Sequence, residues 1–206
     1  MYQSTRALIV AAVLIALTGC SSIYRTTGWF AYDFSESYAM PYVMKTDDTQ
    51  MGCAMSEAMT PMLLSFSELT WSPDRLATTM YMQSGACAEA EASEEGLTYL
   101  RAYKSQNIGE AKDARIRQKR LFALAAQRQY KGYQHLVAEF GEPGETCPDM
   151  DEDEEFFWML GLVSGLQAVM SDVRGQGEVG VPKDIAMKSV RGSQCLDAKR
   201  WWGVPK

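Results

Sequence analysis

Hydrophobic side chains recur at spacings of three and four residues along most of the chain, which is the period of an amphipathic α-helix. The pattern predicts a first helix over 48–69, with a kink at Pro61. A second helix is expected to start at Pro73, a residue that suits the first helical position. It should reach Tyr103, with an interruption near Ser93.

The second half of the chain gives further helical signals. The strongest covers 110–139, where apolar side chains lie on one side and basic side chains largely on the other, as on a solvated face. A helix over 154–172 is apolar nearly all round, which is typical of a buried helix, and Gly161 and Gly165 would let a neighbouring helix approach closely. A last amphipathic helix is predicted over 183–198.

Alternation typical of β-strands does not extend beyond a few residues anywhere in the sequence. We therefore predict one all-α domain over 48–206, made of antiparallel helix hairpins that stack as an α-solenoid or pack as a bundle. The triplets Gly52-Cys53-Ala54 and Ala86-Cys87-Ala88 lie 34 residues apart, the period of a tetratricopeptide repeat, so the solenoid would be tetratricopeptide-like.

Residues 1–19 are typical of a signal peptide. Arg6 supplies a positive charge, and an uninterrupted apolar run follows over 7–17. This run is too short to span the roughly 30 Å hydrocarbon core of a bilayer as a helix.

The apolar run ends in Leu17-Thr18-Gly19-Cys20, which resembles the lipobox of bacterial lipoproteins. There the chain is cut before the cysteine, and the thiol is joined to diacylglycerol. Cys20 is thus the expected lipidation site, and 20–47 the lipidated segment and linker. Ser21 resembles the outer-membrane sorting signal of Gram-negative lipoproteins, and this resemblance implies that the protein lies on the periplasmic face of the outer membrane.

An oxidising compartment changes the interpretation of the other four cysteines. They allow three pairings, of which we favour Cys53–Cys87 and Cys147–Cys195. Free buried thiols are the alternative.

Composition argues against several classes of function. There are 20 basic and 26 acidic side chains, with a net charge of −6 and pI near 4.9, so the chain lacks the clustered positive field of nucleic-acid-binding proteins. His135 is the single histidine, and no Gly-x-Ser-x-Gly, Walker or dinucleotide motif occurs. We expect no catalysis, no cofactor and no metal site, and a partly exposed or partner-facing role for His135.

The acidic run at 149–155 invites a calcium interpretation, but its register does not fit an EF-hand loop, because Glu154 stands where glycine is needed. Negative charge at a helix N-terminus is the favoured interpretation.

Methionines recur at helical spacing in the first predicted helix, which is typical of a packed face or an adaptable apolar cavity rather than a Cu(I) site. If the domain binds a ligand, the expected lining residues are Met55, Met59, Met62, Phe157, Trp158 and Leu162.

Four segments together resemble the T-component lipoproteins associated with TRAP transporters. They are Leu-Thr-Gly-Cys at 17–20, Ala-Met-Thr-Pro-Met-Leu-Leu at 58–64, Phe-Phe-Trp-Met-Leu-Gly at 156–161, and Cys-Leu-Asp at 195–197 with Trp-Trp-Gly at 201–203. The resemblance implies an all-helical, tetratricopeptide-related lipoprotein without enzymatic activity. Such a protein would associate with a periplasmic TRAP-type solute-binding protein and bind or transfer a small hydrophobic or organic-acid ligand.

Two other interpretations remain. The first is a tetratricopeptide-like lipoprotein scaffold for envelope assembly machinery, and the second is a periplasmic metal-binding lipoprotein. The resemblance also leads us to expect a further C-terminal helix in a longer form, and a homo-oligomer is left open.

Overall fold

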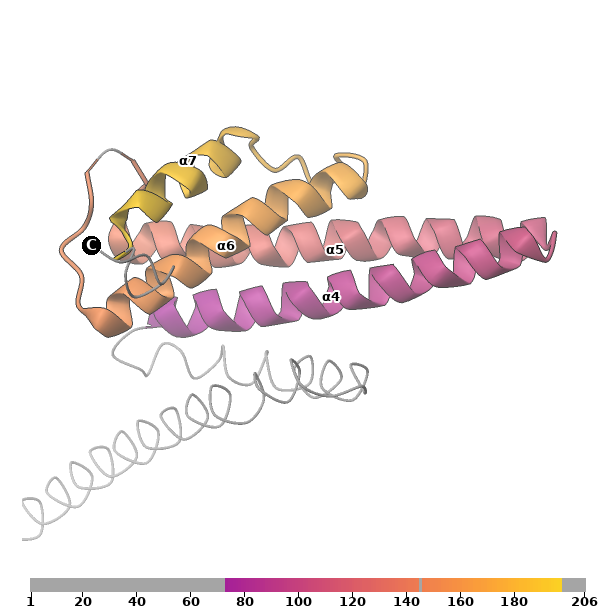
Figure 1. Ribbon diagram of the computed structural model, residues 1–206, viewed down its shortest axis with the longest axis horizontal. Helices are drawn as coiled ribbons and strands as arrows, with labels where there is room; N and C mark the ends of the chain where they lie inside the picture. Colours follow the sequence, from indigo (N-terminus) through magenta and orange to yellow (C-terminus); the bar gives the residue numbers. More distant parts are fainter. Residues whose placement is uncertain (1–72, 145, 198–206) are drawn as a thin grey trace, which may run out of the picture.

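All regular secondary structure in the computed structural model, which describes residues 73–144 and 146–197, is helical (Figure 1). The elements in chain order are α4 (Pro73–Lys104), α5 (Ile108–Phe140), α6 (Glu152–Arg174), α7 (Asp184–Gly192) and a 3-10 turn (Ser193–Cys195). The all-α prediction is therefore confirmed for the described residues.

Several predictions lie outside the described residues. They concern the signal peptide over 1–19, Cys20 with the segment 20–47, the helix over 48–69, and Cys53. They remain expectations from the sequence.

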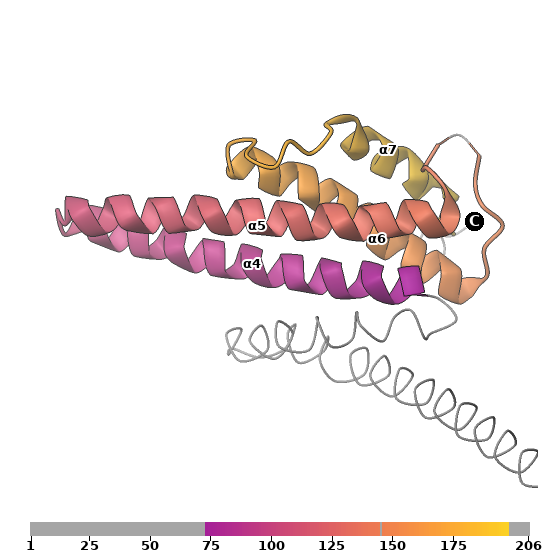
Figure 2. The ribbon, with the colours of Figure 1, turned by 180° about the vertical axis from the view of Figure 1, so that it is seen from behind.

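Two long helices form an antiparallel hairpin that runs the length of the described domain (Figures 1 and 2). α4 has 32 residues and α5 has 33, so each is about 50 Å long. A three-residue turn joins them, in which Gln106 adopts a positive φ of 61°. The side chain of Asn107 caps α5 by accepting a hydrogen bond from the Glu110 backbone N–H.

The predicted interruption of α4 near Ser93 is wrong. The helix starts at Pro73, as expected, and continues unbroken through Ser93 to Lys104. The Ser93 hydroxyl donates to the Glu89 carbonyl and the Thr98 hydroxyl to the Glu94 carbonyl, so both side chains bond back within the helix instead of ending it.

A 34-residue helix–turn–helix repeat would place a turn within a segment as long as α4. The unbroken helix Pro73–Lys104 contains none. The described residues thus form an antiparallel hairpin within a bundle, and a tetratricopeptide-like solenoid is not seen in this part of the chain.

α6 lies diagonally across the hairpin, and glycines permit the close approach (Figure 1). A Cβ atom at Gly161 would lie 2.5 Å from the Leu136 Cβ, and one at Gly165 would lie 2.5 Å from the Tyr133 ring and 2.7 Å from the Ser189 hydroxyl. The two glycines therefore seat α5 and α7 against α6, as predicted.

α6 is partly buried, because one side of it lies between the hairpin and α7, whereas Val163, Leu166, Met170 and Val173 are exposed. Its length and composition would suffice to cross a membrane, but 56% of its apolar window is buried within the described structure. A helix in the core of a protein has such an apolar composition because its side chains pack against neighbouring helices. The central cluster comprises Ala126, Tyr133, Leu136, Trp158, Leu162, Ala168, Val181, Ile185 and Leu196.

The last predicted helix is shorter than expected. α7 ends at Gly192, where the chain tightens into the 3-10 turn, and Leu196 is extended. The turn includes Cys195, which is joined to Cys147 with a Cα–Cα distance of 5.3 Å. This is one of the two favoured pairings. Cys87 is also disulfide-bonded, and its partner lies outside the described residues.

Candidate functional site

An open groove of about 340 Å³ lies between α5 and α7. Its lining mixes aromatic and aliphatic side chains with charged and amide groups. The lining residues are Tyr130, Tyr133, Gln134, Val137, Glu142, Pro182, Asp184, Ile185 and Lys188.

Helical spacing brings the α5 residues to one face, because Tyr130, Tyr133, Gln134 and Val137 follow one another at steps of three, one and three residues. The opposite wall depends on the turn between α6 and α7. Buried Asp172 holds that turn, since its two carboxylate oxygens accept hydrogen bonds of 3.0 and 2.9 Å from the backbone N–H groups of Val179 and Val181.

Three charged side chains form the rim of the groove. Lys188 Nζ lies 3.0 Å from Glu142 Oε2 and 3.0 Å from Asp184 Oδ2. Hydrogen bonds to Asp184 and then to Glu142 raise the pKa of Lys188, and the bond from Lys188 lowers the pKa of Asp184. The rim thus carries one positive and two negative charges at neutral pH.

The floor of the groove is apolar, with Ile185 and the Tyr133 ring buried in the core. Burial, reinforced by the negative charge of Glu142, raises the pKa of the Tyr133 phenol. It stays neutral at physiological pH, with its oxygen 3.5 Å from Glu142 Oε2. The groove therefore presents both apolar and polar groups, with the charged groups at its rim.

The sequence-predicted lining residues lie elsewhere. Met55, Met59 and Met62 are outside the described residues, and Trp158 and Leu162 belong to the central core cluster. The Trp158 indole N–H donates to the buried Gly192 carbonyl at 2.9 Å.

Phe157, the remaining predicted lining residue, is buried with its ring edge-on to Phe156. None of the three described candidates lines the groove between α5 and α7. Two features of the sequence could have indicated the groove: the aromatic face of α5, and the spacing of four residues between Asp184 and Lys188. The sequence did not show that these residues of α5 and α7 lie opposite each other.

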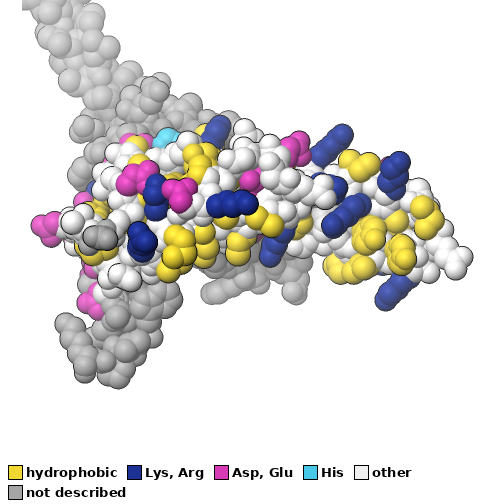
Figure 3. Space-filling model, turned by 90° about the horizontal axis from the view of Figure 1, so that it is seen from above, with side chains coloured by type: hydrophobic (Ala, Val, Ile, Leu, Met, Phe, Trp, Pro, Cys, Tyr) yellow, Lys and Arg dark blue, Asp and Glu magenta, His cyan; other side chains and the backbone are white. Residues whose placement is uncertain are grey.

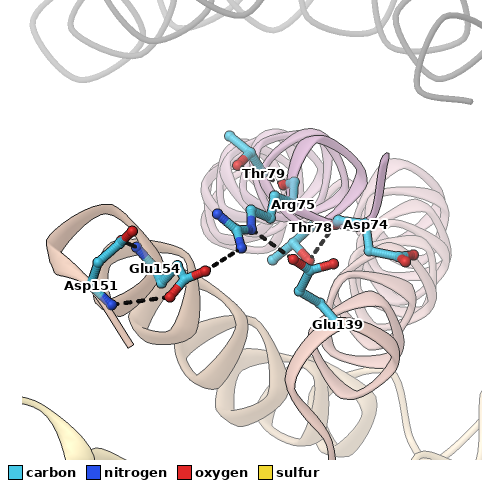
Figure 4. Close-up of polar contacts among 7 residues, drawn as sticks. All are labelled: Asp74, Arg75, Thr78, Thr79, Glu139, Asp151 and Glu154. Atoms are coloured by element: carbon cyan, nitrogen blue, oxygen red, sulfur yellow. Dashed lines mark hydrogen bonds and ion pairs between the residues drawn. The ribbon is translucent and has the colours of Figure 1, made fainter. Parts of the chain in front are cut away.

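A second polar cluster joins three helices at the other side of the bundle (Figure 4). Arg75 of α4 donates from Nε to Glu139 of α5 at 2.8 Å and from Nη2 to Glu154 of α6 at 2.6 Å. Burial alone would lower the pKa of Arg75, but the two hydrogen bonds outweigh it and the pKa is raised. The guanidinium also lies over the rings of Phe140 and Phe157, at 5.5 and 5.8 Å from their centroids.

The acidic run at 149–155 lies at the N-terminus of α6, which is the interpretation that the sequence favoured. Asp151 Oδ1 accepts from the Glu154 N–H at 2.9 Å, and Glu154 Oε2 accepts from the Asp151 N–H at 3.0 Å, which is a capping box (Figure 4). In the described part of the chain, no three His, Cys, Asp or Glu side chains come together as a metal site.

His135 is partly exposed, as expected. Its Nδ1 lies 2.7 Å from Asp74 Oδ1, and its ring stacks on Tyr81 with centroids 5.6 Å apart. These contacts tie α5 to α4, at Asp74 in the first turn and at Tyr81 two turns later.

Replacing Arg75 by methionine is expected to destabilise the fold by about 1–2 kcal/mol at pH 7, because the carboxylates of Glu139 and Glu154 lose their shared partner. Urea unfolding at pH 7 measures the loss.

The matched control is Arg117→Met, which removes an exposed ion pair to Glu95. It should cost less than about 1 kcal/mol. Equal losses in the two variants would contradict the role given to Arg75.

Comparison with known protein-family models, with curated proteins and with solved structures finds no match to this chain. The resemblance to the T-component lipoproteins thus rests on the sequence segments alone.

Proposed function

We propose that this protein is a non-enzymatic lipoprotein, anchored through Cys20 at the periplasmic face of the outer membrane, which works with a TRAP-type solute-binding protein and binds a small ligand. The resemblance of the sequence segments supports the anchor and the partner. The observation that carries ligand binding is the groove between α5 and α7, with its apolar floor and charged rim.

The groove favours a hydrophobic ligand over an organic acid. Lys188 is the one cation of the lining and is already paired with Glu142 and Asp184. A carboxylate ligand would have to displace one of these side chains and would meet the negative charge of the other. An uncharged ligand with an apolar body would neither displace one of these side chains nor be repelled by their negative charge.

The ligand part is tested with N-phenyl-1-naphthylamine, an uncharged probe that fluoresces in apolar surroundings. The variant Gln134→Trp places an indole in the groove from an exposed position. We expect saturable probe binding by the unchanged protein and at least about tenfold weaker binding by this variant, since the site is filled.

The control variant Gln127→Trp introduces the same side chain seven residues earlier, at an exposed position outside the groove lining. It should bind the probe like the unchanged protein. Equal binding by all three proteins would refute the groove as the ligand site.

The partner is tested separately, by crosslinking the full lipidated protein in its native envelope and identifying the partners by mass spectrometry. Enrichment of a TRAP-type solute-binding protein is the expected result. Enrichment of outer-membrane assembly or secretion proteins would instead favour the envelope scaffold.

A further inference from the structure

The end of the α4–α5 hairpin projects beyond the rest of the described bundle (Figure 1). α6 ends level with the middle of α5, because Arg174 lies over the Phe122 ring at 5.5 Å and Gly175 packs against Ala123. We call residues 97–120, which lie beyond this level, the hairpin tip.

The hairpin tip exposes large hydrophobic side chains. Ile108 and Tyr103, which flank the turn, are 65% and 61% exposed, and Leu97, Leu100 and Ile116 are also exposed. The helix contact itself is made by alanines, which are buried at 102, 111 and 114. The large side chains are therefore not required for the hairpin to close.

The hairpin tip is also strongly basic. It holds seven Lys and Arg residues against two acidic ones, which is a local cluster of positive charge that the net charge of −6 of the whole chain did not indicate. On the face shown in Figure 3, hydrophobic and basic side chains gather at this projecting end.

The apolar and basic groups share one surface. Ile108, Lys112 and Arg115 lie on one face of α5 by their spacing of four and three residues. The Arg115 guanidinium lies 5.9 Å over the Tyr99 ring of α4, and that ring stacks on Tyr103 at 6.0 Å. The surface is thus continuous across both helices.

We propose that the hairpin tip binds an anionic phospholipid bilayer. Apolar side chains at a projecting end can enter the boundary between headgroups and acyl chains without a matching groove in a partner. The long Lys and Arg side chains can meanwhile reach the phosphate groups, and tyrosines suit the interface because their rings are apolar and their hydroxyls polar. The positive charge of this segment complements an anionic lipid surface.

The test uses the full chain reconstituted into vesicles, with a dansyl amino acid in place of Ile108. In vesicles of phosphatidylcholine with about one third phosphatidylglycerol, the dansyl emission should shift to the blue and be quenched by lipids brominated on their acyl chains. Vesicles of phosphatidylcholine alone should give neither effect. The same probe at the exposed position Gln127 should change in neither membrane.

The double variant Lys112→Glu and Arg115→Glu should lose the shift, and so should the unchanged tip in about 1 M salt. The control pair Lys183→Glu and Arg191→Glu changes the net charge equally at exposed positions of α7 or just before it, and should keep the shift. A probe at 108 that stays in water in both membranes, or the same shift in both, overturns the proposal. Probe binding to the groove is measured independently and does not depend on this outcome.

Discussion

Alanine in place of Trp158 is expected to lower the free energy of unfolding by about 3–5 kcal/mol, the range for removing a large aromatic side chain from a core. Trp158 is 1% exposed, and its ring meets Phe140 edge-on at 5.8 Å. The substitution would leave a cavity at the point where α5, α6 and the end of α7 meet. Urea unfolding followed by circular dichroism measures the loss.

The variant Trp158→Phe separates packing from hydrogen bonding. Phenylalanine keeps most of the ring but leaves the Gly192 carbonyl without its indole donor, which should cost about 1–3 kcal/mol. Val173→Ala is the control, because Val173 lies on the same helix but is largely exposed, and it should change stability by less than about 0.5 kcal/mol.

The result also decides what Trp158 does. If Trp158→Ala leaves stability unchanged and abolishes binding of N-phenyl-1-naphthylamine, then Trp158 lines a ligand site, as the sequence suggested. A large loss of stability with probe binding retained at low denaturant would establish it as a core residue only.

Local patterns predicted the helices of the described region well, because helix formation depends on residues three and four positions apart. The start at Pro73, the strong helix over 110–139 and the negative charge at the beginning of α6 all follow from such neighbours, although α6 begins two residues earlier than predicted, at Glu152. The close helix contacts at Gly161 and Gly165 were also predicted, since only small side chains permit them.

The groove and the Arg75 cluster could not be predicted in this way. Arg75 and Glu154 are 79 residues apart, and nothing in either local sequence shows that α4 and α6 meet there. The apolar character of Phe157, Trp158 and Leu162 is equally compatible with a core and with a cavity lining. Only the position of α7, which covers one side of α6, shows that Trp158 and Leu162 pack in the core.

α7 is a short helix, and this makes the Cys147–Cys195 disulfide important for the groove. α7 has nine residues, and its N-cap position carries no side-chain cap. A helix this short is not stable alone, so it depends on tertiary contacts. The disulfide fixes the chain just after α7 to the loop before α6, and the α5–α7 groove needs both walls in place.

The double variant Cys147→Ser and Cys195→Ser is therefore expected to lose about 4 kcal/mol of stability, the chain-entropy value for a cross-link between residues 48 positions apart. Binding of N-phenyl-1-naphthylamine should weaken with it, because α7 would leave the groove more often. Hydrogen exchange should show the largest increase over Asp184–Gly192, while the central part of the α4–α5 hairpin changes least.

A reductant supplies the control for this prediction. Since it also opens the disulfide of Cys87, it should destabilise both proteins and remove the difference between them. If the unreduced variant is as stable as the unchanged protein and exchanges its α7 amides equally slowly, then packing against Gly165 and Trp158 holds α7 without the cross-link. The groove would then be a feature of the helix packing alone.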